Sequence, residues 1–171
     1  KTKLRKWDFD TFKQHHTTGD AYTQLTDLPK SVKEIIDVEN SENLIIQHNN
    51  ELAYTQVSDQ AKHDGVIIEG LSEALVNHSD LVQKYFMTKA VDVDEHRLTA
   101  LHTALVNGGI FVYVPKNTVV EHPIQYVVLH DDEQASFYNH VIIVTEESAE
   151  VTYVENYLSP TSGEDNQLNI V

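Results

Sequence analysis

The chain has 171 residues and a mass of 19.4 kDa, which is about the size of one domain. Its 12 Lys and Arg against 27 Asp and Glu give a net charge of −15 at pH 7, so nucleic acid and anionic membranes are poor partners. The absence of Cys excludes from these residues a disulfide scaffold, a Cys nucleophile and a thiolate-held metal cluster. No apolar run reaches the roughly 18 residues of a membrane-spanning helix, and no secretory signal opens the sequence, so we expect a cytoplasmic protein.

Both ends of the sequence have features of an internal segment. The chain opens on Lys1 without Met, and residues 167–171 resume an apolar, strand-like pattern after the polar residues 159–166. Natural termini more often consist of polar residues. We therefore expect an ordered fragment of a longer protein, and we expect its uncapped last strand to favour self-association.

Residues 1–108 have the pattern of a mixed α/β region. Two strand-like runs, 43–48 and 52–57, flank the turn sequence Asn49-Asn50-Glu51, which predicts a hairpin. The apolar spacing over 71–87 predicts two short amphipathic helices, the second of them with Ser79 or Asp80 as its N-cap.

A further helix is predicted over residues 94–105, where Leu98, Leu101 and Leu105 recur at helical spacing. Acidic Asp94 and Glu95 would lie in its first turn, where the helix dipole favours them. The pair Gly108 and Gly109 would end the helix, with at least one of them at positive φ.

Residues 109–171 have only strand patterns. Apolar or alternating runs begin at Ile110, Ile124, His140 and Glu150, and the connections between them are too short for helices. A doubly wound α/β sheet is therefore excluded, because parallel strands in that fold need crossover helices. An antiparallel sandwich and a solenoid of strands remain open.

Histidines are the first candidates for a metal site. His122, His130 and His140 fall on or beside neighbouring strands and could converge with the acidic residues 131–133 on a divalent metal. No spaced pair fixes them on one face, so separate structural roles are the favoured interpretation. The adjacent His15 and His16 point apart in an extended segment.

Two more histidines lie on the predicted helix 94–105. His96 and His102 are six positions apart, about 240° around the helix axis, so they cannot share a ligand. A surface role is the favoured interpretation for both.

The acidic clusters at 92–95, 131–133 and 146–147 could supply the paired carboxylates of a polysaccharide-cleaving enzyme. We favour solvated turns, because a catalytic acid needs an apolar setting that raises its pKa. Gly108 and Gly109 follow a helix and precede a strand, the reverse of the order in a phosphate-binding loop.

Aromatic Trp7, Phe9 and Phe12 lie beside the basic residues of the segment 1–6, a pattern superficially like a nucleic-acid stacking patch. The strongly acidic chain favours instead a docked segment that buries its aromatic side chains.

Longer stretches carry a family resemblance. Residues 98–105 read LTALHTAL, residues 108–116 read GGIFVYVPK, residues 119–125 read VVEHPIQ, and residues 3–9 read KLRKWDF. These stretches resemble the signature of the SufB/SufD family of the SUF iron–sulfur cluster assembly machinery. The resemblance implies a right-handed parallel β-helix whose first coils begin at residue 109, preceded by the mixed region 1–108, both parts of one longer chain.

Within the family, the sequence is more similar to SufD. SufB typically has Trp and Ser before the glycine pair and Gly after the proline–lysine, whereas this chain has Val106, Asn107 and Asn117 at those positions. The absence of Cys is compatible with SufD, the less cysteine-dependent paralogue.

The resemblance implies a non-catalytic scaffold subunit that pairs with SufB and binds the ATPase SufC. Cluster and ATP chemistry would then belong to the assembled complex, with no cofactor, metal or catalytic residue in this segment. The family's SufC-binding helices and subunit interface lie mainly in its C-terminal part. A SufB fragment, with Cys further along the chain, and a β-helix enzyme acting on polysaccharide are the alternatives.

Overall fold

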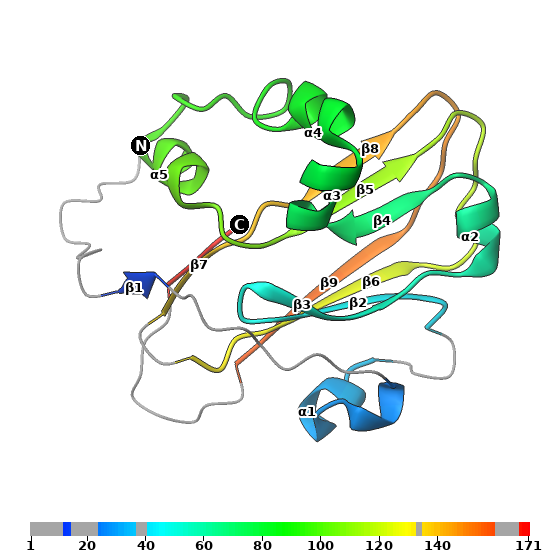
Figure 1. The fold of residues 1–171 in the computed structure, drawn as a ribbon, viewed down its shortest axis with the longest axis horizontal. Helices are drawn as coiled ribbons and strands as arrows, with labels where there is room; N and C mark the ends of the chain where they lie inside the picture. The colour runs from blue at the N-terminus through cyan, green and yellow to red at the C-terminus, as the bar shows by residue number, and fades with distance from the viewer. Residues whose placement is uncertain (1–11, 15–23, 37–40, 133–134, 160–167) are drawn as a thin grey trace.

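The computed structural model describes residues 12–14, 24–36, 41–132, 135–159 and 168–171. It is a mixed α/β structure, mostly β, in which helices lie around a set of extended strands (Figure 1). No helix in these described ranges is long and apolar enough to cross a membrane. The predictions made for Trp7, Phe9, His15, His16 and Glu133 fall outside the described residues.

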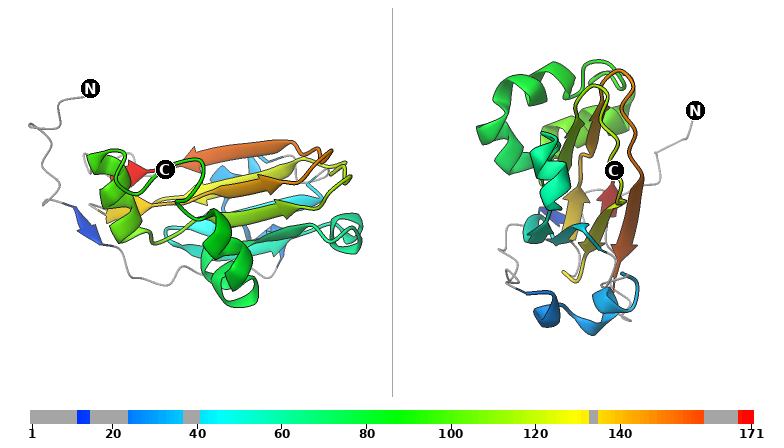
Figure 2. Two further views of the ribbon diagram at one scale, coloured as in Figure 1. Left: turned by 90° about the horizontal axis from the view of Figure 1, so that it is seen from above. Right: turned by 90° about the vertical axis from the view of Figure 1, so that its right-hand side faces the viewer.

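The described strands form three sheets. The first sheet has the order β3 (Glu51–Gln56), β2 (Asn43–His48), β6 (Ile124–Leu129) and β9 (Tyr153–Leu158). The second sheet has the order β4 (Ile67–Gly70), β5 (Ile110–Val114) and β8 (Ile142–Thr145). The third sheet joins β1 (Lys13–Gln14), β7 (Ala135–Tyr138) and β10 (Leu168–Ile170). Two further views show how these layers are stacked (Figure 2).

Parallel pairing is the main feature of the strands after Gly109. β5 pairs with β8, β6 with β9 and β7 with β10, each in parallel, and each partner lies about 30 residues further along the chain. Antiparallel pairing among the described strands is confined to β2 with β3 and β4 with β5. The antiparallel sandwich is therefore wrong for the second half of the chain.

The predicted strand positions are largely correct. β5 and β6 begin at the expected Ile110 and Ile124, whereas β8 and β9 begin two to three residues later than His140 and Glu150. Glu150 instead forms an isolated parallel bridge with Val119. β7 was not predicted, because its alternation is hidden by burial on both faces.

The predicted hairpin is confirmed by the antiparallel pairing of β2 with β3. Asn49 takes φ 56° in the turn, a conformation that Asn tolerates better than most residues. The register shifts between Ile46 and Gln47, which is the mark of a β-bulge. The bulge changes the direction of the following side chains at the end of β2.

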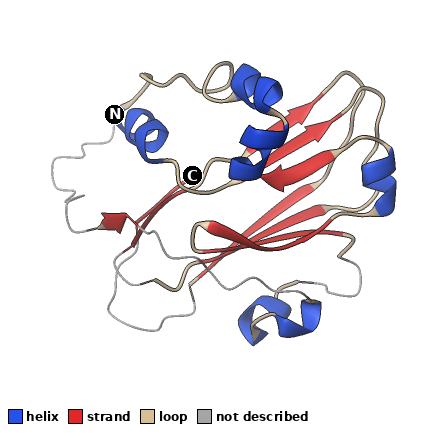
Figure 3. Cartoon of the chain, viewed as in Figure 1, coloured by secondary structure: helices blue, strands red, loops and turns tan. Residues whose placement is uncertain are grey.

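The two predicted helices over 71–87 are confirmed as α3 (Leu71–Asn77) and α4 (Ser79–Tyr85). The predicted N-cap is wrong. Ser79 is already the first helical residue, and His78 occupies the N-cap position without a side-chain hydrogen bond. The described residues also form two short helices, α1 (Lys30–Lys33) and α2 (Asp59–His63), and the 3-10 turn Leu25–Asp27 (Figure 3).

The helix predicted over 94–105 is α5 (Arg97–Leu105), which begins later than expected. A capping box decides the start: His96 Nδ1 accepts from the Leu98 backbone N–H, and Thr99 Oγ1 accepts from the His96 backbone N–H. Asp94 and Glu95 thus precede the helix and do not lie in its first turn.

The glycine pair does not cap α5, because the C-cap is Val106, with φ −47° and ψ 121°. Gly109 does take positive φ, as predicted for one of the pair. Its reason is a close approach to another strand, described below.

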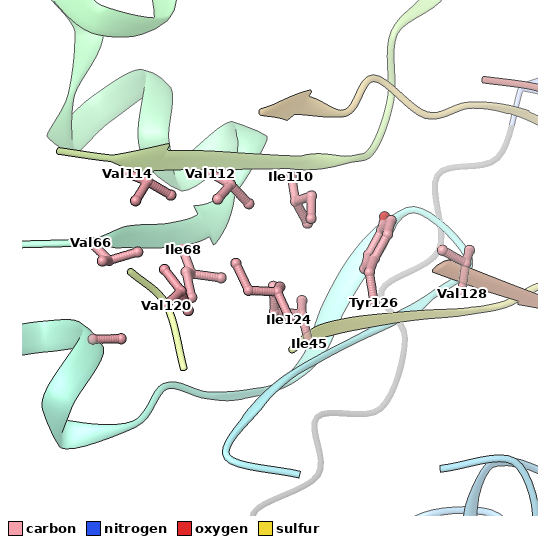
Figure 4. Close-up of a cluster of buried hydrophobic side chains, with 11 residues drawn as sticks. Ile45, Val66, Ile68, Ile110, Val112, Val114, Val120, Ile124, Tyr126 and Val128 are labelled. Carbon is pink, nitrogen blue, oxygen red and sulfur yellow. The ribbon is translucent and has the colours of Figure 1, made fainter. Parts of the chain in front are cut away.

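The largest apolar cluster fills the space between the first and second sheets (Figure 4). It is built from the inward side chains of β2, β4, β5 and β6 and includes Ile45, Ile68, Ile110, Val112, Ile124 and Tyr126. A second cluster lies under α1 against the outer face of the first sheet, and a third lies under α3 and α4 against the second sheet. Each fully buried aliphatic side chain contributes about 1.5 to 3 kcal/mol.

Candidate functional site

A buried glutamine connects the three sheets at one end of this interior. Gln47, at the end of β2, is 1% exposed and uses its whole amide. Its Nε2 donates to the Asn49 carbonyl and to Asn139 Oδ1, both at 2.7 Å. Its Oε1 accepts from the Gly109 backbone N–H at 3.0 Å and from the Tyr126 hydroxyl. We name these residues (Gln47, Asn139, Gly109, Tyr126) the glutamine network.

The glycine pair lets two strands approach this network. Gly108 and Asn139 form a parallel bridge, and the His140 N–H donates to the Gly108 carbonyl at 2.9 Å. Gly109 has φ 121°, and a Cβ there would lie 2.1 Å from the His140 carbonyl oxygen. Only glycine fits both the conformation and the space.

Tyrosines of β9 continue from this network toward the surface. The Tyr157 hydroxyl donates to Glu155 Oε1 at 2.6 Å, and both side chains lie on the same side of β9 as Tyr153. Burial raises the pKa of Tyr126, Tyr153 and Tyr157, and the nearby Glu155 raises all three further. These phenols therefore stay protonated at neutral pH, and those of Tyr126 and Tyr157 act as hydrogen-bond donors.

A histidine pair lies next to the network. His102 Nε2 of α5 and His140 Nδ1 are 2.9 Å apart, and the Phe86 ring lies 4.7 Å from the His140 ring. Burial, followed by the nearby His102, lowers the pKa of His140 to about 4. Burial also lowers the pKa of His102, partly opposed by the Ile170 backbone. Both imidazoles are neutral at pH 7, so one ring donates and the other accepts.

The histidine pair borders a cavity of about 350 Å³. Apolar side chains from α5, from the segments around it and from the end of β10 form most of its wall, namely Met87, Val91, Leu98, Val141, Ile170 and Val171. Neutral imidazoles are the form that binds metals, but two nitrogens do not complete a coordination shell. Across the described ranges, no three His, Asp or Glu side chains are grouped to hold a metal ion.

A second polar contact joins the hairpin turn to the end of β6. Asp131 Oδ2 lies 2.8 Å from His48 Nε2, and Asn49 Nδ2 donates to Asp131 Oδ1 at 3.0 Å. The Asp131 N–H donates in return to Asn49 Oδ1. Partial burial would raise the pKa of Asp131, but the hydrogen bonds from His48 and Asn49 outweigh it and hold that pKa below its usual value.

The structure separates the three histidines considered for a metal site. The His130 ring stacks on Phe137 with centroids 3.7 Å apart, and His140 pairs with His102. His122 is exposed, and its carbonyl accepts from Asn43 Nδ2. The metal hypothesis for this trio therefore has no geometric support.

The sequence favoured a surface role for both histidines of the predicted helix, and the structure does not fully support this role for either of them. His96 is the N-cap of α5, and His102 is buried, only 5% exposed. The acidic residues 92–95 are exposed, while Glu147 forms an ion pair with Lys116.

Sequence reasoning missed Gln47 and Asn139, the two side chains on which the glutamine network depends. Gln47 carried one signal, because it is a polar residue directly after the apolar run 44–46 on a predicted strand. A polar side chain at such a position is buried only with partners, and those partners lie far away in sequence.

Comparisons with known proteins match this chain to one family. The model of the SufBD protein N-terminal region matches residues 21–126. The chain is 46% identical, over 100% of its own length and 39% of the relative, to the iron–sulfur cluster assembly protein SufD of Bacillus subtilis. It is 30% identical to a SufBD family protein of Pyrococcus horikoshii, over 80% of this chain and 32% of that protein.

A SufBD family protein of Staphylococcus saprophyticus is also 30% identical, over 67% of this chain and 24% of its own length. The chain thus spans well under half the length of the curated relatives that it matches.

Proposed function

Because this chain belongs to the SufB/SufD family and is most like SufD, we propose that it is part of a scaffold subunit for iron–sulfur cluster assembly. In this proposal the complete protein pairs with SufB and binds the ATPase SufC in the cytoplasm. It positions its partners and carries out no chemistry of its own.

The observation that carries the proposal is the ladder of parallel strands. Each strand of β5, β6 and β7 has its partner about 30 residues later, on a separate sheet from the other two. This repeat supports a parallel β-helix, with β5 to β7 as one coil and β8 to β10 as the next, and we propose the right-handed form. Such a stack gives a rigid, elongated body suited to holding partners apart at fixed positions.

The glutamine network supports a structural role for the buried polar groups. Each polar atom of the Gln47 amide makes two hydrogen bonds, and one of each pair reaches a residue outside the sheet of β2, namely Asn139 or Gly109. A site that performs chemistry keeps groups available to a reactant. Here both polar atoms of the Gln47 amide are used within the fold.

Co-expression of the complete parent protein with SufB and SufC tests the proposal. We expect the parent to co-purify with both proteins and the 1–171 segment to lack this binding, since the family's contact surfaces lie mainly in its C-terminal part. Failure of the complete parent to bind either protein would contradict the scaffold role. Binding by the 1–171 segment would instead place an interface in the first coils.

Free strand edges support self-association of the isolated chain. Among the described strands, β8, β9 and β10 are the last of their sheets, and Ile143 of β8 and Tyr157 of β9 are 39% and 36% exposed. Such edges are templates for pairing with another chain. Analytical ultracentrifugation should show concentration-dependent dimers, and a strict monomer at high concentration would contradict this proposal.

A further inference from the structure

A groove lies between two other free strand edges, those of β3 and β4, which are not part of the parallel strand pairs. Among the described strands, β3 is the first of its sheet and β4 the first of its own, so each has one side without a described neighbour. The two edges lie close together, because a Cβ on Gly70 of β4 would be 2.7 Å from Leu52 Cδ1 of β3. Figure 1 shows β4 beside the β2–β3 hairpin, with α3 following directly from β4.

Two hollows run along these edges and adjoin at Leu52 and Glu73. The first, about 440 Å³, is lined by residues 52–55 of β3, by Ile68 and Glu69 of β4 and by Glu73 of α3. The second, about 320 Å³, continues past Glu51 and Gly70 to the glycine pair. Together they form one groove, which we name the β3–β4 groove, with Leu52 at its centre.

The backbone of β3 is available along this groove. β3 pairs with β2 on one side, and within the described ranges its backbone has no hydrogen bond to another strand on the other. Natural sheets commonly protect such an edge with Lys or Pro, and residues 51–56 contain neither. An unprotected, concave strand edge is the feature that peptide-binding domains use to add a strand from a partner.

The charge of the groove defines the partner. Glu51, Glu69 and Glu73 line it, and no Lys, Arg or His is among its described lining residues. The Glu69 carboxylate already has partners: it lies 3.4 Å from His78 Nε2 and accepts a hydrogen bond from Asn77 Nδ2. Glu51 and Glu73 have no ion pair within the described residues, and Glu73 is exposed.

We propose that the β3–β4 groove binds an extended, basic peptide segment of a partner protein. The segment adds a strand to the free edge of β3, an apolar side chain covers Leu52, and Lys or Arg side chains lie near Glu51 and Glu73. This binding is independent of the proposed SufB and SufC contacts.

Three labelled peptides test the proposal by fluorescence anisotropy on the 1–171 chain. The first alternates Lys with Val or Thr over eight residues, the second has Glu at each Lys position, and the third is the Lys peptide with alternate backbone nitrogens methylated. We expect the Lys peptide to bind and the other two to bind at least tenfold more weakly. Methylation leaves the charges in place, so its effect isolates the strand contact.

Variants that reverse or neutralise a groove charge locate the site. Glu73→Lys should weaken binding of the Lys peptide about tenfold, and Glu51→Gln should weaken it a few-fold, because each removes attraction from a partly exposed pair. Glu121→Lys is the matched control, since Glu121 is exposed and lies outside the groove. An unchanged melting temperature shows that each variant is folded.

Three results would overturn the proposal. Equal effects of Glu73→Lys and Glu121→Lys would indicate attraction to overall charge only. Equal binding of the methylated peptide would exclude strand addition, and the absence of any binding by the Lys peptide at millimolar concentration would exclude the site.

Discussion

The interior between the first and second sheets has two ends with different chemistry, and Figure 4 shows both. At one end Val66, Val114 and Val120 pack against one another with apolar contacts alone. At the other end the Tyr126 hydroxyl points into the interior, where it donates to Gln47.

The difference shows how the two ends specify the structure. Apolar contacts are non-directional, so the valine end tolerates small changes of shape. Hydrogen bonds are directional, and a buried donor or acceptor that loses its partner costs about 1 to 3 kcal/mol. The glutamine end therefore fixes the mutual position of the three sheets, and we expect substitutions there to be more damaging.

The largest expected effect is at Gly109. Gly109→Ala should lower the free energy of unfolding by more than about 4 kcal/mol, because the new Cβ would lie 2.1 Å from a backbone oxygen of His140 at φ 121°. Gly65→Ala is the control, since Gly65 also has positive φ but the nearest atom to its Cβ is Pro115 Cγ at 3.7 Å. Urea unfolding measures both, and equal losses would contradict the close approach.

Substitution of Gln47 should have the next largest effect. Gln47→Leu leaves the Gly109 N–H and the Tyr126 hydroxyl without their partner, which should cost about 3 kcal/mol. Ile45→Val, in the apolar part of the same strand, should cost only about 1 kcal/mol.

A double-mutant cycle sharpens this test. Adding Tyr126→Phe to Gln47→Leu removes the donor that Gln47→Leu left unpaired. The double mutant should therefore lose less free energy of unfolding than the two single mutants lose in total. Strict additivity in chemical denaturation would show that the hydroxyl and the amide are not coupled.

Acid should destabilise the chain through His140, which lies next to the glutamine network. The pKa of His140 is about 4 in the folded chain and about 6.5 when unfolded, so the unfolded chain binds more protons between these values. The free energy of unfolding should therefore fall by on the order of 2 kcal/mol as the pH drops from about 6.5 to about 4.

Above pH 6.5 the titration of His140 should no longer change the free energy of unfolding. Histidine NMR titration of the folded chain gives the pKa directly, and His140→Leu should remove most of the stability change in this range. A His140 pKa near 6.5 would contradict the buried pair.

The smallest expected effect concerns Asp131, beyond the glutamine end. The hydrogen bonds from His48 and Asn49 lower its pKa in the folded chain, so its contribution is present above the unfolded value and is lost as the pH falls through the folded one. Asp131→Asn should cost about 1 kcal/mol or less at pH 7, because the carboxylate is partly exposed. Thermal unfolding measures the loss, and a rise in stability would contradict it.

Local sequence patterns determined much of the secondary structure. The hairpin around Asn49, the two helices over 71–87 and the starts of β5 and β6 follow from turn chemistry and apolar spacing. The family was also readable, because the stretches over 98–125 form a long and specific signature. These features depend on residues that are close together in the chain.

Helix boundaries were less well predicted. α5 begins at Arg97 because a histidine acts as its N-cap, a residue type outside the usual capping set. The acidic pair at 94–95 therefore indicated a start that is three residues too early.

Strand pairing and the glutamine network were decided by the tertiary structure alone. An apolar alternation shows which face of a strand is buried, but it does not name the strand beside it. The partners of the Gln47 side chain in Gly109, Tyr126 and Asn139 lie 62, 79 and 92 residues away in sequence. A buried polar group is stable only when such distant partners converge on it, and that convergence exists only in the folded chain.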